Sequence, residues 1–196
     1  MTLQELIIIF RHKYHLNLND IAEYVGVNVS TVSRWESGHV KNINQEKQDR
    51  LSSLFKIDVA DYLKHHFFKP IVGVVKAGYD YFAHEDIEGY EPVSKHDYDV
   101  GDYFLRVKGD SMIGSRIFED DLILVQQTTD VNSGELGIVM INGDEATVKR
   151  VIKKENLLIL ESSNPQYETR YFTAKEVEAL PVQIIGRVLK VKVDVH

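Results

Sequence analysis

The sequence predicts a two-domain α + β protein, with an all-α domain first and a mostly antiparallel β domain second. Apolar residues recur at helical spacing from Leu3 to about Phe67. Pro70 interrupts this pattern, and an extended segment follows. From Tyr103 onward, short apolar runs alternate with turn signals such as Asn142-Gly143. A chain of 196 residues is long enough to form two separate hydrophobic cores.

The first domain, residues 1–68, is expected to hold five helices. The first helix begins near Leu3 and ends around His15 to Asn17. Two short helices fill residues 19–38, and two amphipathic helices follow, from about Gln45 to Phe55 and from an Asp58 N-cap to Phe67.

Residues 19–38 have the pattern of a helix-turn-helix motif. Its shared core would come from Ile21, Val25, Val32 and Trp35. Gly26 permits a left-handed turn between the two helices, and Asn28 is a good N-cap for the second. Similar helix pairs also occur in ordinary bundles, and we expect Trp35 in the core rather than stacked on a base.

The outer face of the second short helix would then meet DNA. Arg34 could bind guanine in bidentate fashion, Ser30 and Ser33 could contact a base or a phosphate, and Val29 could touch a thymine methyl group. Phosphate contacts are expected at helix starts and in the loop after this helix. The candidate DNA-binding residues are Asn17, Asn19, Asn28, Val29, Ser30, Thr31, Ser33, Arg34 and Lys41.

Charge and composition narrow the functional class. The net charge is −7, yet residues 1–69 hold nine Lys and Arg against eight Asp and Glu, so the acidity lies downstream. A near-neutral DNA-reading domain predicts modest DNA affinity per protomer and dependence on dimerisation.

The chain has no cysteine, which excludes disulfides, thiolate metal sites and a thiol nucleophile. The early apolar run, Leu6 to Phe10, is too short for a signal peptide or a membrane span, so we expect a cytoplasmic protein with no membrane partner, cofactor or metal.

Residues 69–80 are predicted to form a linker that contains an Ala77-Gly78 step. Side chains alternate in extended chain, so Val75 and Ala77 would face one way, toward small apolar pockets, while Lys76 stays in solvent. Gly78 would let the backbone bend close to a nucleophile. Taken alone, an Ala-Gly pair also simply marks a loop.

The second domain, residues 81–196, is predicted to be built from short strands with one short helix at Ala174 to Leu180. The expected strands are Tyr103 to Lys108, Leu122 to Gln126, Gly137 to Ile141, Glu145 to Lys153, Leu157 to Glu161, Thr169 to Phe172 and Gln183 to Val193. Asp120 tolerates a left-handed turn before the second of these strands.

Ser111 and Lys149 are the candidate catalytic pair of this domain. Ser111 follows a strand in a Gly-Asp-Ser-Met turn, where the backbone N–H groups of Ser111 and Met112 could stabilise an oxyanion. No histidine is convincingly placed as its base. Lys149 lies between Val148 and Val151, where burial would favour a neutral amine that can act as general base. Without further information, a solvated strand lysine remains the simpler interpretation.

The order of these motifs resembles the LexA-like and phage-repressor-like family of self-cleaving regulators, which join a helix-turn-helix domain to an S24-type Ser-Lys peptidase domain. The resemblance covers essentially the whole chain. It implies Ser111 as nucleophile, Lys149 as base and cleavage between Ala77 and Gly78, with Val75 completing a Val-x-Ala-Gly cleavage motif. Val29 departs from the glutamine common in the family.

The resemblance further implies a dimeric repressor that binds an inverted-repeat operator in double-stranded DNA and cleaves itself once, in cis. A RecA filament would stimulate that cleavage after DNA damage. Two alternatives remain open. The β domain could only dimerise and bind an antirepressor protein, with the serine and lysine inert, or the protein could be a peptidase that acts on other chains.

Overall fold

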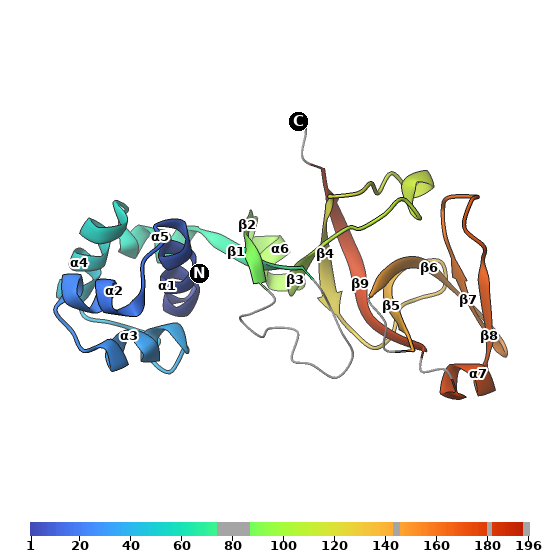
Figure 1. Ribbon diagram of the computed structural model, residues 1–196, viewed down its shortest axis with the longest axis horizontal. Helices are drawn as coiled ribbons and strands as arrows, with labels where there is room; N and C mark the ends of the chain where they lie inside the picture. The colour runs from blue at the N-terminus through green and yellow to red at the C-terminus, as the bar shows by residue number, and fades with distance from the viewer. Residues whose placement is uncertain (74–86, 143–145, 180–181, 194–196) are drawn as a thin grey trace. The chain divides into compact units, whose positions relative to one another are not determined.

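The computed structural model describes residues 1–73, 87–142, 146–179 and 182–193 (Figure 1). It divides into two compact units, one made of Met1–Phe68 with Pro92–Ser94 and the other of Lys69–Glu91 with Lys95–His196. The first is helical and the second consists mainly of antiparallel strands, so the predicted fold class is confirmed. No helix in the described ranges is long and apolar enough to cross a membrane.

Five helices build the first unit, as predicted. They are α1 (Leu3–Lys13), α2 (Leu18–Val25), α3 (Val29–Glu36), α4 (Gln45–Phe55) and α5 (Val59–His65). Helix α1 ends earlier than expected, and His15 just beyond it has a left-handed backbone with φ 53°. Helix α5 also ends early, because residues from Phe67 onward have already entered a strand.

The turn between α2 and α3 has the predicted left-handed glycine where α2 ends, but it lacks a side-chain cap where α3 begins. Gly26 has φ 74°, a left-handed conformation that costs a glycine little. Asn28 does occupy the N-cap position of α3, but its side chain makes no capping hydrogen bond, so the expected cap is wrong in mechanism. A side-chain cap is present instead at Asn17, which accepts from the backbone of Asn19 and Asp20 at the start of α2.

Trp35 lies in the core of the helical unit, as expected, and is only 1% exposed. It packs with α1 residues such as Leu6 and Phe10 and with Ile21 of α2. A salt bridge of 2.7 Å between Arg11 and Glu36 joins α1 to α3 on the outside of this core. The position of α3 therefore depends on tertiary packing as much as on the turn.

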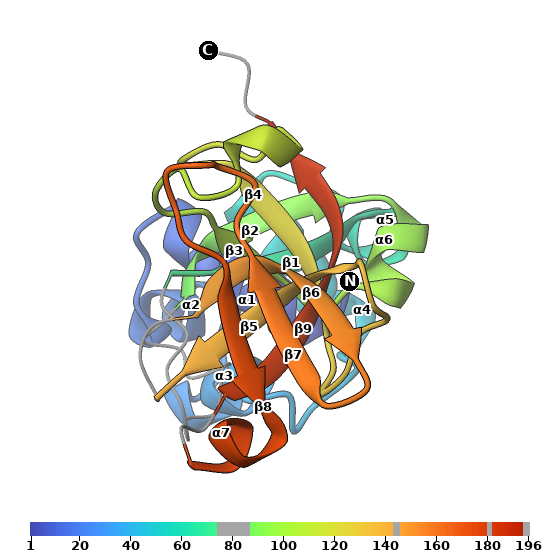
Figure 2. The same ribbon diagram turned by 90° about the vertical axis from the view of Figure 1, so that its right-hand side faces the viewer.

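The second unit contains one nine-stranded sheet in the order β2-β1-β3-β4-β9-β5-β6-β7-β8. Figure 2 shows the long strand β9 curving through the middle of this sheet. The strands are β1 (Phe67–Val72), β2 (Ile87–Val93), β3 (Tyr103–Arg106), β4 (Leu122–Gln127), β5 (Leu136–Ile141), β6 (Thr147–Lys154), β7 (Leu157–Glu161), β8 (Arg170–Thr173) and β9 (Val182–Lys192).

Most of these strands fall within a few residues of the predicted ranges, and α7 (Ala174–Ala179) matches the one predicted helix. Strand β2 and the helix α6 (Lys95–Val100) were not predicted. Strand β1 starts at Phe67, where the sequence predicts helix. Pro70 disfavours a helical backbone at Lys69, the residue before it, which agrees with an extended chain there, but the strand begins two residues earlier than this local rule requires.

Strand β1 departs from the antiparallel pattern, since it runs parallel to β3 with Ile71 opposite Phe104 and Val72 opposite Leu105. Both strands therefore lead the chain toward the same end of the sheet. After β3 that end continues into the turn that carries Ser111. After β1 it continues through Gly73 to the segment with Val75, Ala77 and Gly78, which lies outside the described residues.

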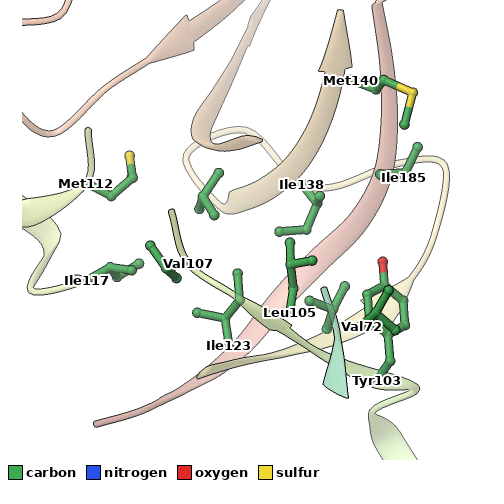
Figure 3. Close-up of a cluster of buried hydrophobic side chains, with 12 residues drawn as sticks. Val72, Tyr103, Leu105, Val107, Met112, Ile117, Ile123, Ile138, Met140 and Ile185 are labelled. Atoms are coloured by element: carbon green, nitrogen blue, oxygen red, sulfur yellow. The ribbon is translucent and has the colours of Figure 1, made fainter. Parts of the chain in front are cut away.

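The main core of the β unit holds Met112 at one end and Val72 and Tyr103 at the other (Figure 3). Met112 is 2% exposed and follows Ser111 directly. Val148, which precedes Lys149, belongs to the same core. Each candidate catalytic residue is thus attached to a buried neighbour, which limits its movement.

Replacing Trp35 tests its role in the core. Trp35→Ala should destabilise the helical unit by about 3–5 kcal/mol, because it leaves a large cavity. Thermal denaturation followed by far-ultraviolet circular dichroism measures this loss. Tyr24→Ala is the control, since Tyr24 is 50% exposed. A Trp35→Ala variant with full stability would contradict the core assignment.

Candidate active site

The candidate nucleophile lies in a turn that two backbone hydrogen bonds hold against the start of β4. Val107 donates to the carbonyl of Asp121, and Asp120 donates back to the carbonyl of Val107. Asp120 has φ 69°, the left-handed conformation predicted for it. Ser111 is half-buried here, between the buried Met112 and the solvent.

Lys149 reaches this turn from strand β6. Its Nζ donates to Ser111 Oγ at 3.0 Å, to Thr147 Oγ1 at 3.1 Å and to the carbonyl of Val148 at 3.0 Å. The structure therefore brings the predicted nucleophile and base into direct hydrogen-bond contact, although 38 positions separate them in the sequence. Thr147, which sequence reasoning did not single out, helps to hold the amine in place.

The environment of Lys149 lowers the pKa of its ammonium group. Partial burial is the larger cause, because it penalises the charged form, and the positive charge of Arg170 adds to the effect. Neutral amine is therefore present at lower pH than for an ordinary lysine. A neutral amine in contact with a serine hydroxyl can accept its proton.

The two predicted oxyanion donors are available for a ligand. Within the described ranges, the backbone N–H groups of Ser111 and Met112 donate no hydrogen bond to the protein. Both residues line a small pocket of about 60 Å³, together with Gly73, Val107 and Ala146. Gly73 is the last described residue before the predicted cleavage segment, so the chain enters this segment beside Ser111.

A larger cleft of about 450 Å³ also reaches Ser111 and Lys149. Charged side chains that line it are Lys108, Asp110, Glu168 and Arg170. Of these, Arg170 affects the pKa of Lys149. No sequence signal marks Arg170, because its influence on Lys149 arises only when β8 folds into the same sheet as β6, with β7 between them.

The predicted DNA-binding residues lie in the other unit and differ in exposure. Those at the exposed surface are Asn17, Asn19, Asn28, Val29, Ser30, Ser33, Arg34 and Lys41. Thr31 is half-buried, so it is the weakest of these candidates. The side-chain oxygen of Asn17 is already used to cap α2.

Among the described residues, no histidine lines either of the two pockets beside Ser111. His96 is exposed in α6, and His84 lies outside the described residues. In the part of the chain that the structure describes, no group of three or more His, Cys, Asp or Glu side chains could hold a metal ion.

Fold and site together define a helix-turn-helix protein whose β domain presents a serine with a lysine partner. Residues 70–189 match the Peptidase S24-like family, and residues 7–62 match a helix-turn-helix family. The chain belongs to the Peptidase S24-like family, and the family resemblance inferred from the sequence is confirmed.

Several LexA repressors are similar to this chain. The protein from Geobacter sp. is 40% identical over 121 residues, which are 61% of this chain and 58% of that protein. The protein from Geotalea uraniireducens is 43% identical over 120 residues, with shares of 61% and 58%, and that from Bacillus velezensis is 35% identical over 129 residues, with shares of 65% and 59%. The chain thus spans less than two thirds of the length of the relatives it matches.

Removing the positive charge of Arg170 should raise the pKa of Lys149 toward the ordinary lysine value. In Arg170→Gln, the neutral amine then appears only at higher pH, so the midpoint of its reactivity moves upward. Acetylation of Lys149 at a series of pH values, quantified by peptide mass spectrometry, measures this midpoint. Lys154→Gln, which removes an exposed charge outside the cleft, should leave the midpoint in place. A midpoint in Arg170→Gln that stays constant or falls would refute the electrostatic role.

Proposed function

We propose that this protein is a dimeric, sequence-specific DNA-binding repressor that inactivates itself by cutting its own chain between Ala77 and Gly78. The observation that supports this most strongly is the 3.0 Å contact between Lys149 Nζ and Ser111 Oγ in a domain of the Peptidase S24-like family. The helix-turn-helix unit that precedes this domain supplies the DNA reader. The similar proteins are named repressors.

Cleavage would proceed through an acyl-enzyme. Neutral Lys149 takes the proton of Ser111, whose Oγ attacks the carbonyl carbon of Ala77. The backbone N–H groups of Ser111 and Met112 stabilise the resulting oxyanion. Lys149 then gives the proton to the nitrogen of Gly78, which leaves as a new amino terminus. Water, activated by the neutral amine, hydrolyses the ester and regenerates Ser111 with the carboxylate of Ala77.

A cut in cis fits the way in which the chain approaches the site. Gly73 lines the pocket beside Ser111 and stands four residues before Ala77. Four extended residues reach about 14 Å, so the scissile bond is tethered near the nucleophile. Tethering gives a high effective concentration, and one chain offers one bond to its own serine. Val75 would fill an apolar pocket during this step.

Repression would come from the helix-turn-helix unit. The exposed face of α3 presents Arg34, Ser30 and Ser33 to the major groove, while Lys41 contacts phosphate. Dimerisation would join two such units on an inverted repeat and supply avidity that one near-neutral unit lacks. Cleavage would separate each reading unit from the dimer, so the operator is released. We place this activity in the cytoplasm, with a RecA filament as the stimulus.

Incubation near pH 10 tests the self-cleavage. The wild-type chain should give fragments that end at Ala77 and begin at Gly78, because high pH neutralises Lys149, and mass spectrometry identifies both ends. Ser111→Ala and Lys149→Ala should remain intact, and Lys154→Ala should cleave as the wild type does. An intact wild-type chain would favour a repressor that only dimerises and binds an antirepressor. If the chain that retains Ser111 cleaved an added linker peptide, this would instead favour a peptidase that acts on other chains.

Two variants separate base reading from phosphate binding. In an uncleavable Ser111→Ala background, Arg34→Ala should lose about 1–3 kcal/mol on the preferred sequence and relax specificity at one base pair. Lys41→Ala should weaken all sequences alike and reduce the salt slope by about one. Site selection from a random DNA pool, followed by binding titrations at several salt concentrations, measures both effects. Equal losses on preferred and random DNA for Arg34→Ala would contradict base reading.

A further inference from the structure

Asn164 is a buried polar residue that the mechanism above does not use. It lies in the connection between β7 and β8 and is only 3% exposed. In the described part of the chain, Asp121 is the other polar residue buried to a similar degree. Burial of an amide is costly unless its groups are hydrogen-bonded, so its contacts indicate what it stabilises.

The hydrogen bonds of Asn164 join it to the nucleophile turn and to its own loop. Its backbone N–H donates to the carbonyl of Ser111 at 3.0 Å. Its side-chain Nδ2 donates to the carbonyl of Asp110 at 3.2 Å and to Asp110 Oδ2 at 3.3 Å. Its Oδ1 accepts from the backbone of Gln166 at 3.1 Å, which fixes the orientation of the amide.

These contacts fall on two consecutive peptide groups. The carbonyl of Asp110 shares a peptide plane with the N–H of Ser111, and the carbonyl of Ser111 shares one with the N–H of Met112. A trans peptide is planar, and its C=O and N–H point in opposite directions. Asn164 therefore holds the carbonyl ends of the same two peptide groups whose N–H ends are the proposed oxyanion donors.

We propose that Asn164 is the positioning residue of the oxyanion hole, acting by fixing the peptide planes on either side of Ser111 from their carbonyl side. This inference rests on the proposed cleavage function and deepens it. Asn164 does not touch the reacting atoms. Its effect reaches the transition state through the direction of two N–H groups.

The loop that carries Asn164 is itself fixed against the turn. A Cβ atom at Gly114 would lie 2.1 Å from the carbonyl oxygen of Ser163, so glycine permits this close approach. The hydroxyls of Ser115 and Ser163 are hydrogen-bonded, and Arg150 donates to Ser115 Oγ at 3.3 Å. The position of Asn164 is thus set by backbone contact and not only by its own hydrogen bonds.

An oxyanion-hole role and a role in tuning Lys149 give different pH profiles. Oxyanion donors stabilise charge that develops in the transition state, so their loss lowers the rate at every pH. A change in the pKa of Lys149 moves the midpoint of the profile and leaves the high-pH plateau unchanged. Asn164 carries no charge, and its partners lie on the turn rather than on the amine.

The test uses the full chain and the neutral variant Asn164→Ala. The plateau rate of self-cleavage at high pH should fall by about a hundredfold, the size of effect known for the loss of one oxyanion donor or a small misplacement. The midpoint of the pH profile should equal that of the wild type. Asn132→Ala is the matched control, because Asn132 also donates through Nδ2, to Glu135 at 3.0 Å, but in an exposed turn. It should change neither quantity.

A second readout separates this inference from the proposed function. A fluorophosphonate probe reacts with an activated serine and needs the same oxyanion donors, so its rate of attachment to Ser111 should fall in Asn164→Ala as well. If the wild type is labelled but not cleaved, the proposed cleavage function is wrong. The labelling rate of Asn164→Ala relative to the wild type then still tests the role of Asn164. If the wild type is neither labelled nor cleaved, both proposals are overturned.

Thermal denaturation shows whether Asn164→Ala folds. If it does not, Asn164→Asp keeps the side-chain volume and the acceptor for Gln166 but has no Nδ2 donor, and it should show the same loss of plateau rate. A folded Asn164 variant with a wild-type plateau would overturn the inference. So would Asn164→Ala with only a moved midpoint. Asn164→Asp is compared by its plateau rate alone, because its added charge itself raises the pKa of Lys149.

Discussion

The hydrogen bond between Lys149 and Ser111 is the interaction on which the rest of the site depends. Burial of the amine and the positive charge of Arg170 lower the pKa of Lys149, so that the neutral amine, which can act as a base, is present at lower pH than for an ordinary lysine. The core maintains this arrangement, because Val148 and Met112, the immediate neighbours of the pair, are buried in one cluster. Hydrophobic packing of these neighbours thus offsets the free energy that partial burial of the Lys149 amine costs.

Local features of the fold followed from the sequence, because they depend on neighbours in the chain. The left-handed turns at Gly26 and Asp120 and the buried side of Trp35 are examples, since each is set by residue type and periodicity. The strands of the β unit were also recognisable from alternating apolar runs and turns. Ser111 and Lys149 were identifiable as candidates, but only the family resemblance made them more than a surface hydroxyl and a strand lysine.

Features that depend on distant contacts could not be predicted in the same way. The parallel pairing of β1 with β3 joins residues more than thirty positions apart, Ile71 with Phe104 and Val72 with Leu105. Asn164 and Arg170 act through residues 110–111 and 149, which only the folded sheet brings near them. At Asn28 the local rule predicted the correct helix start, but the side chain makes no capping hydrogen bond.

The site contains two separable determinants of rate, and this bears on how self-cleavage would be regulated. The protonation of Lys149 decides what fraction of molecules has a base, whereas the peptide planes around Ser111 decide how well an oxyanion is stabilised. The catalytic pair and the oxyanion donors are already in place in the described residues. The Lys149 amine is hydrogen-bonded to the Ser111 hydroxyl, and the N–H groups of Ser111 and Met112 donate to no protein group there. In a molecule whose Lys149 is neutral, a pre-assembled site would cut as soon as its substrate were in place. Under the proposed function, the regulated step is therefore the docking of the segment after Gly73, and a stimulating partner needs only to favour that docked state.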